Sequence, residues 1–224
     1  MQLVLDVALA DHATFGDLVA GDNAIAVDAV RRQAEGGDTL IYLFGPKGVG
    51  KSHLLQAACR IASDAAYLPL TDFIAFPPEV LQGWDRHSLL AVDDIEQVAG
   101  HTEWERALFA LFNAVTDAGG RLLMAANARP AELGLALPDL TSRLNWGASY
   151  AIAPLDDGSL ELALTLRARQ RGMTLPADAV RFMITRHARD WDSLVGLLDQ
   201  LDRASLEARK RLSLSFVRKV LGGS

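Results

Sequence analysis

A complete phosphate-binding loop constrains the fold of this chain more than any other segment. Its residues match the pattern GxxxxGK[ST] and run Gly45, Pro46, Lys47, Gly48, Val49, Gly50, Lys51 and Ser52. The apolar run 39–44 before the loop is typical of a buried parallel strand, and residues 52–61 after it have the apolar spacing of a helix. This strand, loop and helix context indicates a nucleotide-phosphate site, whereas a glycine-rich turn with a chance lysine would need no such neighbours.

The residue types in the loop suit a nucleotide bound with Mg²⁺. Its glycines allow successive backbone N–H groups to curl around a phosphate, and the N-terminus of the following helix adds partial positive charge. Lys51 is placed to reach the β and γ oxygens, and the hydroxyl of Ser52 is placed to ligate Mg²⁺. We therefore expect ADP or ATP with Mg²⁺ as the cofactor.

Two later apolar runs end in polar residues. Residues 89–92 lead into Asp93 and Asp94, and a predicted strand over 121–126 ends at Asn127. We expect Asp93 to hold Mg²⁺ directly or through water, and Asp94 to polarise the attacking water. An amide at Asn127 would bond the γ-phosphate and that water, but a turn-forming asparagine is the alternative.

Strands and helices alternate up to about residue 155, and only helices follow. The alternation predicts an α/β fold, a parallel sheet with helices on both faces, followed by a small all-helical lid. We place the domains at 13–155 and 156–224, after an N-terminal peptide over 1–12. Helices are predicted over 23–32, 103–118, 157–171, 177–189, 192–209 and 216–221, and a further strand over 65–70.

Composition excludes several classes of protein. With 224 residues and 50% hydrophobic content, the chain can bury a large core. Its net charge of −6 gives no overall attraction to nucleic acid. Because no uncharged apolar run would span a bilayer and the N-terminus lacks a basic region, we expect a cytoplasmic protein without a membrane partner. The single cysteine, Cys59, fits a small apolar residue on a core helix.

Together these motifs resemble those of an AAA+ ATPase. The loop corresponds to Walker A, residues 89–94 to Walker B, Asn127 to sensor 1 and Arg143 to the arginine finger, and a helical lid follows. By itself, Arg143 would be interpreted as a solubilising surface residue. The similarity narrows to the family of the bacterial replication initiator DnaA and its short relative Hda, on residues 138–147, 166–172 and 198–205.

The resemblance implies further contacts. His53 would join the loop in binding the nucleotide, as would Val19 and Gly21 in the adenine-side segment 14–23. The start of the chain is similar to the peptide by which Hda docks on the replication sliding clamp, where the side chains of Gln2, Leu3 and Leu5 would enter a surface groove. A frayed terminus or an edge strand is the alternative.

The chain departs from the family pattern at two places. Asp6 stands where Hda usually has proline, and Asp192 falls at the position of the sensor 2 arginine. A carboxylate facing the γ-phosphate would repel it, so the resemblance implies a preference for ADP or poor hydrolysis of ATP. Arg189, in the preceding turn, is the candidate substitute.

Three functions compete. The first is an adaptor that, on the DNA-loaded clamp (the β subunit of DNA polymerase III), presses Arg143 against the ATP of DnaA, triggers its hydrolysis and prevents re-initiation. The second is a self-assembling AAA+ ATPase such as a helicase loader, a homo-oligomer in which Asp94 and Asn127 act in cis. The third, a DNA-binding initiator fragment, is disfavoured by the acidic charge and by the lack of room for a helix-turn-helix domain, so we expect no direct sequence-specific DNA binding. Asp192 and the Gln2 peptide favour the adaptor.

Overall fold

The chain divides into two units. The structure, a computed structural model, describes residues 9–188, 190–208 and 210–222, without the side chain of Asp192. One unit contains residues 9–16 and Asn23–Ala153, and the other contains Asp17–Asp22 and residues 154–222. In these described ranges, no helix is both long enough and apolar enough to cross a membrane.

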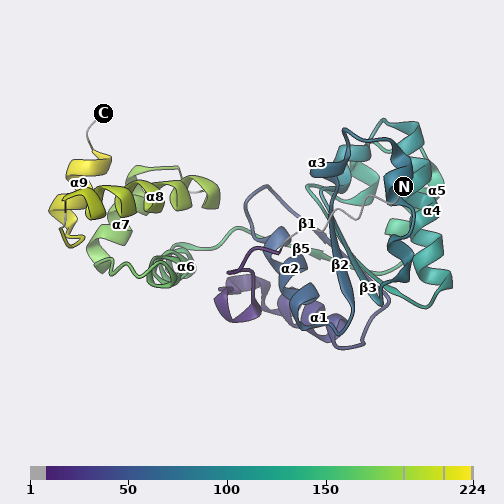
Figure 1. Cartoon of the computed structure of the whole chain (residues 1–224), viewed down its shortest axis with the longest axis horizontal. Helices are drawn as coiled ribbons and strands as arrows, with labels where there is room; N and C mark the ends of the chain where they lie inside the picture. The colour runs from purple at the N-terminus through teal and green to yellow at the C-terminus, as the bar shows by residue number, and fades with distance from the viewer. Residues whose placement is uncertain (1–8, 189, 209, 223–224) are drawn as a thin grey trace. The chain divides into compact units, whose positions relative to one another are not determined.

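The larger unit is built on a five-stranded sheet (Figure 1). The strands are β1 (Leu40–Phe44), β2 (Ala65–Pro69), β3 (Leu89–Asp93), β4 (Arg121–Ala126) and β5 (Ala148–Ala151). They lie in the order β2-β3-β4-β1-β5, and every neighbouring pair is parallel. This arrangement confirms the predicted parallel sheet, and it brings the carboxyl ends of all five strands to one edge.

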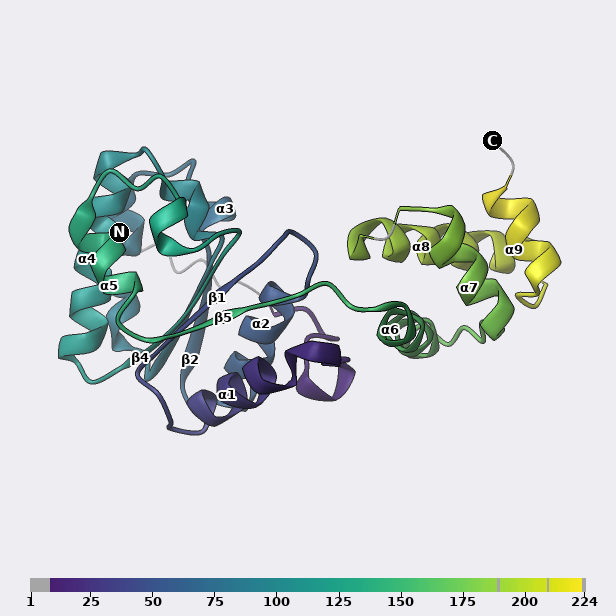
Figure 2. The same ribbon diagram turned by 180° about the vertical axis from the view of Figure 1, so that it is seen from behind.

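Helices cover both faces of this sheet, as predicted. Helices α1 (Ala24–Ala34) and α2 (Lys51–Ile61) lie on one side, and α4 (Thr102–Asp117) and α5 (Pro138–Leu144) lie on the other, as Figures 1 and 2 show. The one-turn helix α3 (Leu70–Phe73) follows β2 directly. Alternate strand residues face opposite layers. Tyr42 and Val92 belong to the core cluster that includes Leu108 and Phe112 of α4.

The smaller unit is helical. It contains α6 (Asp157–Gln170), α7 (Ala177–Arg186), α8 (Trp191–Ala208) and α9 (Leu214–Leu221), around an apolar core of its own. Side chains cap three of these helices. Asp156 accepts a hydrogen bond from the Ser159 N–H, Asp190 accepts one from the Ser193 N–H, and Ser213 accepts one from the Phe216 N–H. The cap at Ser213 explains why α9 begins two residues earlier than the sequence indicated.

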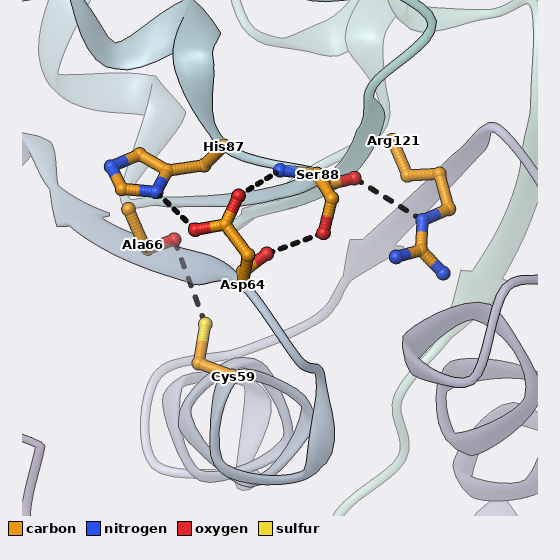
Figure 3. A network of polar contacts seen from close by, with 6 residues as sticks. All are labelled: Cys59, Asp64, Ala66, His87, Ser88 and Arg121. Atoms are coloured by element: carbon orange, nitrogen blue, oxygen red, sulfur yellow. Dashed lines mark hydrogen bonds and ion pairs between the residues drawn. The ribbon is translucent and has the colours of Figure 1, made fainter.

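At the amino ends of the strands, polar groups bond to one another (Figure 3). The Asp64 carboxylate lies 2.8 Å from His87 Nδ1 and accepts a 2.9 Å hydrogen bond from the Ser88 N–H. The Ser88 hydroxyl donates to the Asp64 carbonyl at 2.5 Å, and Arg121 Nε donates to the Ser88 carbonyl at 3.2 Å. These bonds tie together the starts of β2, β3 and β4.

Cys59 lies near this network and is buried on α2. Its thiol donates to the Ala66 carbonyl at 3.6 Å (Figure 3), and burial raises the pKa of Cys59 to about 12. A thiol that stays protonated at neutral pH is a poor nucleophile, so its environment is that of a core residue.

Candidate functional site

The phosphate-binding loop connects β1 to α2 and depends on its glycines. Gly45, Gly48 and Gly50 have φ angles of 154°, 79° and 98°, in the region that side chains disfavour. A Cβ atom at Gly45 would also collide with the carbonyl oxygen of Ile152, in the segment after β5. The loop can therefore adopt this backbone conformation only with glycine at these positions.

Lys51 opens α2 and is only 8% exposed. Its Nζ donates to the carbonyl oxygens of Gly45 at 2.7 Å and Pro46 at 2.9 Å, which hold the ammonium against the loop. Burial lowers the pKa of Lys51, and the charge of Glu96 opposes that shift. Since an ammonium has three N–H donors, one donor remains for a phosphate oxygen.

Asp93 ends β3 and is 1% exposed. Its carboxylate accepts hydrogen bonds from the Tyr67 hydroxyl at 2.8 Å and the Asp94 N–H at 3.0 Å, and it also bonds the Ser52 side chain. Burial raises the pKa of Asp93 despite these bonds. The two residues predicted to hold Mg²⁺, Ser52 and Asp93, are thus in direct contact.

Asp94 adopts a left-handed backbone conformation. With a φ of 57°, it is the one non-glycine residue with positive φ in the described part of the chain. Its side chain accepts a 2.7 Å hydrogen bond from the Thr71 hydroxyl. Such a conformation costs on the order of 1 kcal/mol or more and is concentrated at functional sites. Here it ends β3 and turns the chain into a short 3₁₀ helix, Ile95–Val98.

Glu96, which the sequence analysis did not single out, belongs to this edge of the sheet. Its Oε2 accepts a 3.1 Å hydrogen bond from the backbone N–H of Asn127, at the end of β4. Burial raises the pKa of Glu96, and the Lys51 ammonium lowers it by attraction. The spacing of two residues from Asp94 is the available sequence signal, but the turn at Asp94 that brings Glu96 back could not be anticipated.

Arg143 lies in the last turn of α5. Its guanidinium carbon lies 3.8 Å from the ring centroid of Trp146 and 5.9 Å from that of Phe109 on α4. Within the ranges that the structure describes, Arg143 forms no ion pair and donates no side-chain hydrogen bond. The structure therefore places Arg143 in an aromatic cluster rather than in contact with Lys51 or Asp93.

Glu105 fixes the segment that leads into α5. This fully buried carboxylate on α4 accepts hydrogen bonds from the backbone N–H groups of Gly100, Ala136 and Leu137, at 2.9, 3.0 and 2.7 Å. Three N–H donors compensate a buried negative charge well. The start of α5 is thereby attached to α4.

The structure places only some of the remaining residues predicted to bind nucleotide or the clamp. His53 Nε2 lies 2.7 Å from the Thr14 carbonyl oxygen, so its ring faces the N-terminal segment. Val19 and Gly21 belong to the segment Asp17–Asp22, which groups with the helical unit. The predicted clamp-binding residues Gln2, Leu3 and Leu5 lie outside the described residues, as does Arg189.

Two family models match the chain. The model "Hda, lid domain" matches residues 156–221, which include α6 to α9, and "Bacterial DnaA ATPase domain" matches residues 81–151, which include β3 to β5.

Solved structures with the same fold include two DnaA proteins. Domain III of the Thermotoga maritima replication initiation protein DnaA superposes with a TM-score of 0.86 at 21% identity, over 97% of this chain and 98% of that one. AMPPCP-bound DnaA from Aquifex aeolicus gives a TM-score of 0.75 at 21% identity, over 90% of this chain and 68% of that one.

A branch migration motor has the fold as well. The RuvB Holliday junction branch migration motor of Thermotoga maritima gives a TM-score of 0.64 at 17% identity, over 89% of this chain and 66% of that one. At such identities, these structural likenesses establish the fold. Combined with the two family matches, they support a DnaA-related, Hda-like AAA+ protein.

Proposed function

We propose that this protein binds ADP or ATP at the Gly45–Ser52 loop and acts as an adaptor that stimulates hydrolysis of the ATP held by DnaA. The glycine conformations and the buried Lys51 beside the loop carbonyls support phosphate binding. In two of the similar DnaA structures the protein carries AMPPCP, which is a nucleotide analogue.

Mg²⁺ suits the oxygen donors beside the loop. Ser52 and Asp93 would hold the ion, which would neutralise charge on the phosphates. Among the described residues, no group of three or more His, Cys, Asp or Glu side chains could hold a metal. Phosphate and water oxygens would therefore complete the coordination, as is usual for Mg²⁺ at nucleotide sites.

The main observation that supports the adaptor function is the environment of the Arg143 side chain. Its guanidinium contacts two aromatic rings and forms no ion pair in the described ranges, so its N–H donors are available to a partner. An arginine delivered in trans neutralises charge that develops on the transferred phosphoryl group. We propose that Arg143 does this for ATP bound to DnaA, in keeping with the match to the Hda lid domain.

The rival function is a self-assembling ATPase. Asp94, Glu96 and Asn127 lie at the carboxyl edge of the same sheet as Lys51, where they would serve hydrolysis in cis, and Arg143 would then serve the next identical subunit. The sequence places Asp192 at the position of the sensor 2 arginine, and a carboxylate there would disfavour hydrolysis in cis.

Replacing Arg143 with alanine tests the adaptor. We expect the variant to remain folded and to bind nucleotide normally, but to lose stimulation of DnaA. The loss should approach 10³- to 10⁵-fold in rate, about 4 to 7 kcal/mol of barrier. Lysine should restore little, because a point charge does not reproduce the planar fork. The measurement is ATP hydrolysis by DnaA with clamp-loaded DNA.

The same assay separates the two functions. Substantial hydrolysis by the wild type without DnaA, lost in Arg143→Ala, would favour the self-assembling ATPase. Normal stimulation of DnaA by Arg143→Ala would eliminate the trans-acting arginine.

We propose that the sliding clamp is bound through Gln2, Leu3 and Leu5. Replacing Gln2 and Leu3 with alanine should abolish clamp binding while leaving nucleotide affinity and melting temperature unchanged, because such a peptide adds affinity through side chains that enter a groove on the clamp. Binding to immobilised clamp measures the effect. Equal affinity of the double variant and the wild type for the clamp would show that Gln2 and Leu3 do not bind it.

A further inference from the structure

Arg143 and Trp146 form a close cation–π pair. The guanidinium carbon lies 3.8 Å from the ring centroid of Trp146, well within the range of about 6 Å over which a ring face attracts a cation. The two residues are close in sequence, and the backbone N–H of Trp146 donates to the Arg143 carbonyl at 3.1 Å where α5 ends. The same turn that ends the helix thus sets the indole under the guanidinium.

Trp146 is unusually open for a tryptophan. The residue is 63% exposed, although its ring packs edge-to-face on Phe112, with the ring centroids 6.4 Å apart. Phe112 belongs to the core of the sheet unit, so one side of the indole is anchored while most of it faces solvent. An indole anchored in this way can hold the Arg143 guanidinium at the surface, where a partner can reach it.

The stacking restrains Arg143 without using its hydrogen-bond donors. A guanidinium carries five N–H donors in its plane, and a stacked ring contacts only the face of that plane. In the described ranges, none of these donors is used in an ion pair. Bidentate recognition of a phosphate uses the edge of the guanidinium, so the indole and a phosphate can hold it together.

We propose that Trp146 is a positioning residue that holds the Arg143 guanidinium ready for the γ-phosphate of a partner subunit. This inference rests on the proposed trans-acting role of Arg143. A free arginine side chain would lose rotamer freedom on reaching the phosphate, and the indole removes part of that loss in advance. Removing the ring should therefore lower the maximal rate of DnaA-bound ATP hydrolysis about tenfold, a change comparable to one cation–π contact.

The test compares four variants in the DnaA ATPase assay. Trp146→Leu should reduce the maximal rate about tenfold, and Trp146→Phe, which keeps a ring face, should retain most of it. Phe76→Ala, which removes another exposed aromatic ring of the same unit, is the matched control and should be neutral. In the Arg143→Ala background, Trp146→Leu should have no further effect, because its action passes through Arg143.

A second measurement does not depend on DnaA. The Arg143 Nε–H resonance should carry a ring-current shift that is absent from Trp146→Leu and retained in Trp146→Phe. An unchanged resonance in Trp146→Leu, or full ATPase stimulation by this variant while Arg143→Ala is inactive, would overturn the positioning role alone. Full stimulation by Arg143→Ala would instead reject the proposed function on which the inference rests.

Discussion

The two edges of the parallel sheet use polar residues in opposite ways. At the amino edge, Asp64, His87, Ser88 and Arg121 are joined by hydrogen bonds (Figure 3), and Arg121 also donates to backbone carbonyls at the end of α1. At the carboxyl edge, charged groups are buried close together, and burial moves the pKa of Asp93 upward and that of Lys51 downward.

The difference teaches how a structural cluster differs from a candidate site in this fold. The amino-edge groups are partly exposed and mutually satisfied, so their bonds stabilise the starts of three strands. The carboxyl-edge groups are kept in charge states that burial disfavours, which costs stability and is typical of sites that await a charged ligand. Substitutions at the two edges should therefore change the free energy of unfolding in opposite directions.

Among substitutions at the two edges of the sheet, the largest effect is expected at Lys51. Lys51→Ala should weaken ADP and ATP binding tenfold or more, about 1.4 kcal/mol or above, because backbone N–H groups cannot replace its charge. Isothermal calorimetry measures both affinities. Lys219→Ala, which removes an exposed lysine of α9, is the control. Equal affinities of Lys51→Ala and the wild type for ADP and ATP would contradict the proposed nucleotide site.

A smaller loss of stability is expected at the amino edge. Asp64→Asn should lower the free energy of unfolding by about 1 kcal/mol at pH 7, since it weakens the bonds to His87 and Ser88. These bonds hold the pKa of Asp64 below its usual value, so their contribution is present above pH 4 or so and is lost as the pH falls further. Denaturant titrations at pH 7 and pH 3 measure the change, with the exposed Asp38→Asn as control. A difference that grows on acidification would contradict this account.

The smallest effect, with the opposite sign, is expected at Asp93. Asp93→Asn removes a buried charge whose pKa burial raises, so at pH 7 without nucleotide it should increase the free energy of unfolding by about 0.5 to 1 kcal/mol. The gain should disappear as the pH falls and Asp93 of the wild type becomes protonated. Thermal unfolding at several pH values, without nucleotide, measures it. Destabilisation at pH 7 would place Asp93 with the structural residues of the amino edge.

Much of the fold could be predicted because the sheet is parallel and buried on both faces. Continuous apolar runs such as those of β1 and β3 can be recognised as strands in the sequence, and β4 was predicted with its observed bounds. The helix predicted over 177–189 ends earlier, at Arg186.

The residues of the site could be predicted only where they belong to a recognisable sequence motif. The loop and Asn127 follow strands and Asp93 ends one, so their common edge could be expected from parallel topology alone. The sequence did not indicate Glu96 as a site residue or the contact between Trp146 and Arg143, because both depend on the backbone turns at Asp94 and at the end of α5. The turn at Asp94 contains neither the glycine nor the proline that usually marks such a position, and Gly147, which follows Trp146, does not indicate what the indole contacts.

Glu105 has a consequence for the motions of the arginine-bearing helix. Its carboxylate serves as the common acceptor for N–H groups at Gly100, before α4, and at Ala136 and Leu137, before α5. Release of either loop would leave a fully buried anion with fewer donors, so the two loops are expected to open in one cooperative event. Helices α4 and α5 are therefore expected to move together, which would preserve the 5.9 Å separation between the Arg143 guanidinium and the Phe109 ring.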